Sequence, residues 1–182
     1  MELNYSLTEN DYLQQQLYLA SKDEQYKKTR KIGHIITIVL ILVMGLITYS
    51  LTKKVIFIYL FFVLTIIYCC VSSIYLKLNY KLQYKKYIKR VFENNFGLVV
   101  NLKFEKDLIL ISTLDRNSKF KFSSFENISE TKDHFFITQI SDENFIIPKE
   151  KIEDVSTVRV KLKRIAQEVQ IDFISDLNWE WK

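Results

Sequence analysis

The longest apolar stretch of the chain is "KIGHIITIVLILVMGLITYSLTKKVIFIYLFFVLTIIYCCVSSIYLK", Lys31–Lys77, and it decides how the fold is assembled. Between residues 32 and 76 the only formal charges are two adjacent lysines, which leave uncharged runs of 20 residues (32–51) and 22 residues (55–76). At about 1.5 Å per residue, a helix of either length measures roughly 30 Å, the thickness of a bilayer's hydrocarbon core. The stretch therefore predicts two transmembrane helices.

The two runs are separated only by Thr52, Lys53 and Lys54, so the predicted spans must form a helical hairpin. Lys53 and Lys54 would mark its outer tip, where their long side chains can reach the headgroups. The segments before the first run and after the second run carry eleven basic residues, whereas the turn carries only Lys53 and Lys54. Because basic residues concentrate on the cytoplasmic side, both termini are predicted to be cytoplasmic. The eleven are Lys22, Lys27, Lys28, Arg30, Lys31, Lys77, Lys81, Lys85, Lys86, Lys89 and Arg90.

A cleaved signal peptide does not fit the first run, because a signal's apolar region has about 7–15 residues and lies close to the start. Here residues 1–31 precede the run and include the acidic Glu2, Glu9 and Asp11, and a second run follows at once. Cys69 and Cys70 are adjacent in the second run, so we expect them to be small packing residues and not a disulfide.

The net charge of +5 is unevenly distributed along the chain. Residues 1–97 hold 13 basic and 6 acidic residues, a balance of +7, whereas residues 98–182 hold 13 basic and 15 acidic residues, a balance of −2. The basic excess lies beside the predicted membrane segment and not in the C-terminal half. Nucleic acid is therefore not expected as a partner.

Four lysines, Lys77, Lys81, Lys85 and Lys89, recur every four residues after the second run and would form one stripe on a helix. Such a stripe can be a cationic surface for anionic lipid headgroups. It can equally be the solvated face of a helix that continues the span, its lysines serving only topology. The sequence leaves both interpretations open.

The N-terminal residues alternate, with apolar Leu3, Tyr5 and Leu7 between polar neighbours, which predicts a short half-buried strand. Because the hairpin returns the chain to the same side, we expect residues 1–8 to pair with the sheet formed after Gly97. Thr8 and Asp11 have the spacing of a capping box, which opens a helix that could continue into the first span.

Beyond Gly97 the period becomes two, and short polar connections favour an antiparallel meander. After Pro148 the period becomes helical, and Trp179 and Trp181 near the end are expected to cap the sheet or to touch the membrane interface. The strands are expected at 98–104, 107–114, 119–125, 134–140 and 144–149, and one apolar helical stripe at Ile152, Val155, Val158, Leu162, Ile165 and Val169.

The predicted fold class is α+β, a transmembrane helical hairpin with a small cytoplasmic antiparallel sheet capped by a C-terminal helix. The expected divisions are an N-terminal strand and cytoplasmic helix (1–31), the hairpin (32–76, with spans 32–51 and 55–76), a basic juxtamembrane helix (77–97) and a cytoplasmic domain (98–182).

Two stretches carry a family resemblance: "LNYSLTENDYLQQQLY" (3–18) and "FSSFENISETKDHFFITQISDENFIIPKEKI" (122–152). Both resemble YcxB-like bacterial membrane proteins, whose two halves are separated by two spans. The chain departs from the family at Phe125, where members often have Trp, and at Ile152, where they have a large aromatic residue. The matching residues are Leu7, Thr8, Asp11, Tyr12 and Leu13 in the first stretch, and Phe125, Ile128, Ile147, Pro148 and Lys149 in the second.

The resemblance implies a sheet anchored at the bacterial inner membrane and capped by a helix, similar to pleckstrin-homology-like (PH-like) domains. The function we expect is that of a non-catalytic interaction module that binds another protein beside the lipid bilayer. Some family members resemble immunity proteins, so the alternative is a protein that neutralises an antibacterial toxin at the membrane. Gene neighbourhood would separate the two.

No enzymatic activity, metal or cofactor is expected. The two histidines, His34 and His134, lack metal-ligand spacing, and neither a phosphate-binding loop nor a nucleophile elbow is present. Pro148 has a sufficient structural explanation, because proline removes a backbone donor and ends a strand.

Overall fold

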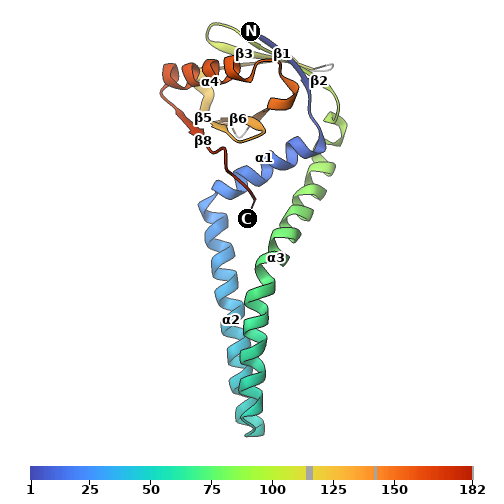
Figure 1. Cartoon of the computed structure of the whole chain (residues 1–182), viewed down its shortest axis with the longest axis vertical. Helices are drawn as coiled ribbons and strands as arrows, with labels where there is room; N and C mark the ends of the chain where they lie inside the picture. Colours follow the sequence, from blue (N-terminus) through green and yellow to red (C-terminus); the bar gives the residue numbers. More distant parts are fainter. Residues whose placement is uncertain (114–116, 142, 182) are drawn as a thin grey trace. The chain divides into compact units, whose positions relative to one another are not determined.

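The computed structural model describes residues 1–113, 117–141 and 143–181, without the side chains of Tyr26, Arg30, Ser73, Ile74 and Leu76. The side chain of Arg30, one of the counted basic residues, and Leu114, the last residue of the expected strand 107–114, therefore lie outside the described part. The chain divides into two compact units (Figure 1). The β unit comprises Met1–Gln16 and Lys85–Glu180, and the helical unit comprises Leu17–Tyr84 and Trp181–Lys182. Each is described by itself.

Three helices connect the N-terminal strand to the rest of the chain: α1 (Glu9–Lys22), α2 (Glu24–Thr52) and α3 (Ile56–Phe92). The expectation of one continuous helix from Asp11 into the first span is wrong, because the chain breaks at Asp23. The Asp23 carboxylate accepts a hydrogen bond from the backbone N–H of Gln25 at 2.8 Å. A short acidic side chain in this position caps a new helix, which accounts for the break.

The turn between α2 and α3 lies where the two lysines interrupt the apolar stretch. Lys53 adopts a left-handed conformation with φ of 55°, and Lys53 and Lys54 are exposed. Among the described residues, one helix, Lys27–Thr52 with 26 residues, is long and apolar enough to cross a membrane. A second candidate exists only if Ile56–Ser72 and Lys77–Asn95, which are bent by 45° to each other, are taken as one span.

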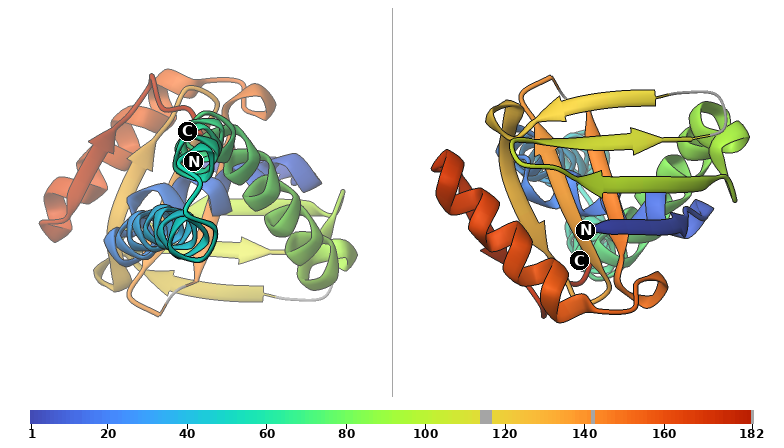
Figure 2. Two further views of the ribbon diagram at one scale, coloured as in Figure 1. Left: turned by 90° about the horizontal axis from the view of Figure 1, so that it is seen from below. Right: turned by 90° about the horizontal axis from the view of Figure 1, so that it is seen from above.

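The β unit contains two four-stranded sheets whose strands run across each other (Figure 2). The first sheet has the order β1-β2-β3-β4 and is antiparallel throughout. The second has the order β7-β6-β5-β8, and β8 pairs parallel to β5. The bounds are β1 Glu2–Ser6, β2 Val99–Phe104, β3 Leu108–Ser112, β4 Asn117–Lys121, β5 Phe125–Glu130, β6 His134–Gln139, β7 Asn144–Pro148 and β8 Asp172–Ser175.

The single antiparallel meander expected from the sequence is therefore wrong in two respects. First, the stretch 119–125 is not one strand, because a 3-10 turn at Phe122–Ser124 carries the chain from the first sheet to the second. Phe122 and Phe125, on either side of this turn, are both buried. Second, residues 125–130 and 172–175 are strands that the alternation did not reveal. β5 is central and has three consecutive buried residues, Ile128, Ser129 and Glu130, so it lacks the period of a half-buried strand.

The expectation that the N-terminal segment joins the sheet is confirmed. β1 pairs antiparallel with β2, with Leu3 opposite Leu102 and Tyr5 opposite Val100. The segment is an edge strand of the first sheet. Tyr5 and Leu7 are buried, so the alternating apolar residues face the core of the β unit.

The C-terminal helix α4 (Val155–Val169) is confirmed as a helix that packs through one apolar stripe. It begins later than expected, because a 3-10 turn at Lys149–Lys151 precedes it and Asp154 caps its first turn by accepting from Thr157 N–H at 2.9 Å. It contacts β5 and β8. Large side chains that are fully buried in the β unit include Ile88, Leu102, Ile109, Phe125, Ile128, Phe135, Phe136, Ile137, Ile147 and Leu162.

Candidate functional site

The strongest concentration of polar chemistry in the β unit surrounds two buried carboxylates, Asp11 and Glu130. Their side chains are 4% and 1% exposed, respectively. A buried carboxylate is costly unless it is paired and hydrogen-bonded, so each must have cationic or donor partners. The two carboxylates, with the residues that bind them, are called the carboxylate cluster below.

Asp11 reaches this position as part of a capping box at the start of α1. Its Oδ2 accepts hydrogen bonds from the backbone N–H and the hydroxyl of Thr8, both at 2.7 Å. In return, the Asp11 N–H donates to the Thr8 hydroxyl at 3.4 Å. The capping box predicted from the Thr8–Asp11 spacing is thus confirmed.

The Asp11 carboxylate also binds two side chains from the second sheet and the turn that follows it. His134 Nε2 lies 2.8 Å from Oδ1, and Lys151 Nζ lies 3.1 Å from Oδ2. Burial by itself would raise the pKa of Asp11, but hydrogen bonds from His134, Thr8 and Lys151 outweigh it and hold the pKa well below its usual value. Asp11 is therefore an anion that joins three separate segments of the chain.

His134 is held on several sides. Its ring stacks on Phe136 with centroids 5.5 Å apart and planes 11° apart. Its backbone N–H donates to the hydroxyl of Thr131 at 3.2 Å, and its carbonyl accepts from the Thr131 N–H at 2.9 Å. Because Nε2 faces the Asp11 carboxylate, that nitrogen carries a proton and donates it.

An aspartate–histidine pair is also part of many hydrolytic sites, where the second ring nitrogen activates a hydroxyl or thiol. Here the pair joins the first turn of α1 to the first residue of β6.

Glu130, at the end of β5, has two cationic partners. Its Oε1 lies 2.7 Å from Lys149 Nζ and 2.8 Å from both Nε and Nη2 of Arg159. Burial alone would raise the pKa of Glu130, but the hydrogen bonds from Arg159 and Lys149 lower it. Lys149 Nζ also donates to the Thr131 carbonyl at 2.5 Å, which ties it to the β5–β6 turn.

The family-motif residues from the C-terminal half all lie in or beside this region. Phe125, Ile128 and Ile147 are buried in the core, and Pro148 lies opposite His134 in the β6–β7 register. Lys149, whose side chain is 10% exposed, is the partner of Glu130. These positions hold the fold together, with Lys149 supplying charge compensation.

Two lysines of the predicted stripe belong to the β unit, where they face Glu9. Lys85 Nζ and Lys89 Nζ lie 3.6 and 3.9 Å from its carboxylate oxygens, with 51% and 56% of their side chains exposed. Exposed pairs of this kind contribute roughly 0–1 kcal/mol. In the helical unit, Lys77 and Lys81 are exposed. Headgroup binding by the stripe stays a prediction.

The two tryptophans near the C-terminus lie outside the carboxylate cluster. Trp181 Nε1 donates to the Lys77 carbonyl at 3.3 Å within the helical unit. Among the described residues, no group of three or more His, Cys, Asp or Glu side chains has an arrangement that could hold a metal ion.

The carboxylate cluster was not anticipated from the sequence. The sequence places His134 at the start of an expected strand, and Asp11 in a capping box and among the residues that match the family, but it does not pair the two. Asp11 and Lys151 are 140 residues apart in the sequence, and Glu130 and Arg159 are 29 apart. Pairs this distant leave no local pattern in the sequence. Glu130 stands between the polar residues Ser129 and Thr131, so its immediate neighbours in the sequence give no sign that it is buried.

Comparison with known protein families matches residues 104–159 to the family described as YcxB-like protein. This segment runs from the end of β2 into α4 and contains the five C-terminal motif residues together with Glu130, His134 and Arg159. The match supports the assignment of a YcxB-like domain to the segment. Searches of curated proteins and of solved structures found no match.

Proposed function

We propose that the protein is a non-catalytic interaction module of a bacterial inner membrane, with its β unit on the cytoplasmic side, where it binds another protein. The observation that carries the proposal is the apolar helix Lys27–Thr52. Only 6% of its most apolar 18-residue segment is buried inside the protein. A helix of this composition requires an apolar environment that the chain itself does not provide. A bilayer supplies one.

The charge distribution supports the orientation. The turn Lys53–Lys54 carries two basic residues, whereas the segments that flank the apolar stretch carry eleven. If Ile56–Ser72 and the helix that follows it form the second span, both ends of the hairpin face the cytoplasm. The β unit, built from residues on both sides of the hairpin, would then be cytoplasmic.

A binding role is favoured over catalysis because the buried carboxylates and the buried histidine of the β unit are engaged with other protein side chains. Asp11, Glu130 and His134 all bind protein side chains, and both carboxylates are almost inaccessible. Two crossed sheets with a C-terminal helix are also compatible with the PH-like architecture that the family resemblance implies. Because a fold by itself does not define a function, this likeness supports a binding role by analogy alone.

Reporter fusions test the membrane part of the proposal. Alkaline phosphatase, which is active only outside the cytoplasm, should be active when fused after Lys54 and inactive when fused after Gly97 or Lys182. Carbonate washing should leave the full chain in the membrane fraction. Phosphatase activity from the Lys182 fusion, or release by carbonate, would contradict the proposal.

Site-specific photo-crosslinking in cells tests the binding part. Ile140 and Val160, which are 71% and 59% exposed in the β unit, are suitable positions for the crosslinker. Buried Ile137 is the matched control, because its side chain cannot reach a partner. A discrete adduct larger than the 21.8 kDa chain is expected from at least one exposed position and not from the control. Adducts from none of a series of exposed positions would contradict a binding role.

A further inference from the structure

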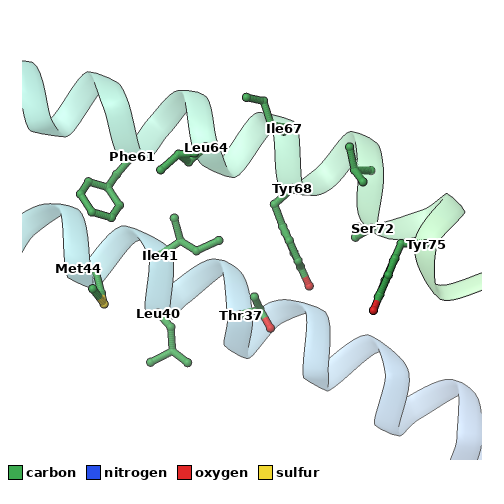
Figure 3. A pocket seen from close by; sticks show the side chains of 11 residues that line it. Thr37, Leu40, Ile41, Met44, Phe61, Leu64, Ile67, Tyr68, Ser72 and Tyr75 are labelled. Carbon is green, nitrogen blue, oxygen red and sulfur yellow. The ribbon is translucent and has the colours of Figure 1, made fainter. Parts of the chain in front are cut away.

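The helical unit has an open hollow of about 690 Å³ between α2 and α3, whose lining Figure 3 shows. Most of the side chains that line it are apolar, and the hydroxyls of Thr37, Tyr68 and Ser72 are hydrogen-bonded to other groups of the same two helices. In the membrane location proposed above, this hollow is part of a surface that faces lipid.

The β unit has a hollow of a different character, about 300 Å³ in volume, between α4 and β8. Two residues connect this helix to this strand. Gln170 adopts a left-handed conformation with φ of 59°, and the Ile171 N–H donates to the Ala166 carbonyl at 3.0 Å. This turn brings β8 back along α4. The hollow, called the edge groove below, is lined by Lys163, Ala166, Gln167, Ile171, Phe173 and Ser175.

The strand that forms one wall of the edge groove is the last strand of its sheet. The Asp176 N–H donates to the Glu130 carbonyl at 2.8 Å, so the backbone groups of Ile174, two residues earlier, also face β5. By the same alternation, the N–H and C=O groups of Phe173 and Ser175 face the outer edge. These are the two residues of β8 whose side chains line the edge groove.

The other sheet edges differ from β8. The edge strands β4 and β7 contact each other, since the rings of Phe120 and Phe145 have centroids 4.7 Å apart. On the outer side of β1, the Ser6 carbonyl accepts a hydrogen bond from Lys151 Nζ at 2.8 Å. In β8, by contrast, three of the four residues are exposed. An edge of this kind is a template for pairing with another chain.

The edge groove carries positive charge. Of the described residues that line it, Lys163 alone has a formal charge, and its Nζ lies 5.3 Å from the centroid of the Phe173 ring. The nearby Glu168 lies outside the lining. Strand alternation places the side chains of Asp172 and Asp176 on the opposite face of β8 from Phe173. The groove therefore favours an anionic group.

We propose that the protein partner binds through an extended segment that adds a strand to β8 and places a carboxylate side chain in the edge groove beside Lys163. This inference rests on the binding role proposed above. The backbone of the segment pairs with the outward N–H and C=O groups of Phe173 and Ser175. A residue directly opposite Phe173 or Ser175 points to the same face of the sheet as they do, which is the face of the groove.

A random peptide library displayed on phage, selected against the detergent-solubilised full chain, tests the proposal. We expect enrichment of sequences that are rich in β-branched residues and contain aspartate or glutamate. The most enriched peptide is then synthesised for binding measurements. A preference for basic peptides, or no enrichment of any sequence, would overturn the proposal.

Two matched pairs of variants locate the site. Ser175→Pro removes an N–H that faces the outer edge, whereas Ser175→Ala keeps it, so only the proline variant should weaken binding, by about tenfold. Lys163→Glu should weaken binding by at least about tenfold. Arg164→Glu, at an exposed neighbour outside the lining, should leave it unchanged. Equal effects within either pair would contradict the assigned site.

Hydrogen exchange of the wild-type chain tests strand addition without any substitution. The amides of Phe173 and Ser175 should exchange rapidly in the free chain and slowly once the selected peptide is bound. The Ile174 amide, which faces β5, should be protected in both states. Unchanged exchange at Phe173 and Ser175 in the presence of bound peptide would exclude strand addition.

Photo-crosslinking in cells separates this inference from the proposed binding role. Gln167 lines the edge groove and is exposed, whereas the exposed Glu168 beside it does not line the groove. We expect an adduct from Gln167 and not from Glu168. Adducts from Ile140 but none from Gln167 would overturn this inference and leave the binding role standing. A dimer of the chain that Ser175→Pro abolishes would instead identify the occupant as a second copy.

Discussion

The Nε2 atom of His134 lies 2.8 Å from Oδ1 of Asp11, a contact that spans 123 positions of sequence. It joins the first turn of α1 to the first residue of β6. The two residues lie on opposite sides of the α2–α3 segment in the sequence, yet they belong to one compact unit. The β unit is therefore assembled from both ends of the chain, and its stability depends on contacts between them.

Replacing Asp11 by Asn should destabilise the β unit by about 3 kcal/mol, because it removes the buried anion that compensates Lys151 and orients His134. Urea unfolding of the detergent-solubilised full chain measures the change. Asp107→Asn is the matched control, since Asp107 is an exposed aspartate of the same unit. Equal stability of the two variants would show that the Asp11 contacts contribute little.

The stability of the β unit should fall as the pH drops below about 5. The pKa values of Asp11 and Glu130 are both lowered in the folded protein. In the unfolded chain, the pKa values of Asp and Glu are about 3.9 and 4.3. The stabilisation that the two ionised carboxylates give the folded state is therefore fully present above that pH range. It is lost as the pH falls through the range toward the lower pKa values of the folded protein.

Chemical denaturation at pH 7, 5, 4 and 3 measures this dependence. Glu130→Gln should show a shallower pH dependence than the wild-type chain, whereas Glu126→Gln, an exposed residue on the same strand, should not. A wild-type stability that does not change between pH 5 and pH 3 would contradict the prediction.

Hydrogen exchange should show alternating protection along β1. Phe104 N–H donates to the Met1 carbonyl at 2.9 Å, so by the alternation of antiparallel pairs the amides of Leu3 and Tyr5 face β2. The amides of Glu2 and Asn4 face away from the sheet, because β1 is an edge strand. We expect slow exchange at Leu3 and Tyr5 and fast exchange at Glu2 and Asn4.

Deleting residues 2–8 should destabilise the same unit without affecting membrane insertion. If Leu3 and Tyr5 exchange as rapidly as in a free peptide, the N-terminal strand does not form in solution. Leu102, on the neighbouring inner strand, provides an internal reference for protection.

Gly45→Ala should loosen the contact between α2 and α3, because the added Cβ would lie 2.8 Å from Phe61 Cβ and 3.1 Å from Cγ. The expected cost is about 1–3 kcal/mol, typical of overpacking. Gly33→Ala is the matched control, since a Cβ there meets nothing within 4 Å and Ala is the better helix former. Thermal unfolding in one detergent, followed by circular dichroism, compares them, and equal melting temperatures would argue against the contact.

Features encoded over a few residues were predictable. The apolar stretch, the break at Lys53 and Lys54, the alternation of Leu3, Tyr5 and Leu7, and the helical stripe through Val158, Leu162 and Ile165 all appear in the structure as helices, a turn and a strand. These patterns indicate which side of each helix or strand faces water and which side faces the core. Each pattern is set by residues only a few positions apart, so it can be recognised in the sequence.

The tertiary structure decided what distant segments share. The division into two sheets arises at Phe122–Ser124, where a short turn redirects the chain, and β8 becomes a strand by pairing with the buried β5. Asp11 becomes a buried anion only because the fold brings His134 and Lys151 to it. Periodicity records whether a residue is buried, but the partner that satisfies a buried charge depends on how the segments meet in space.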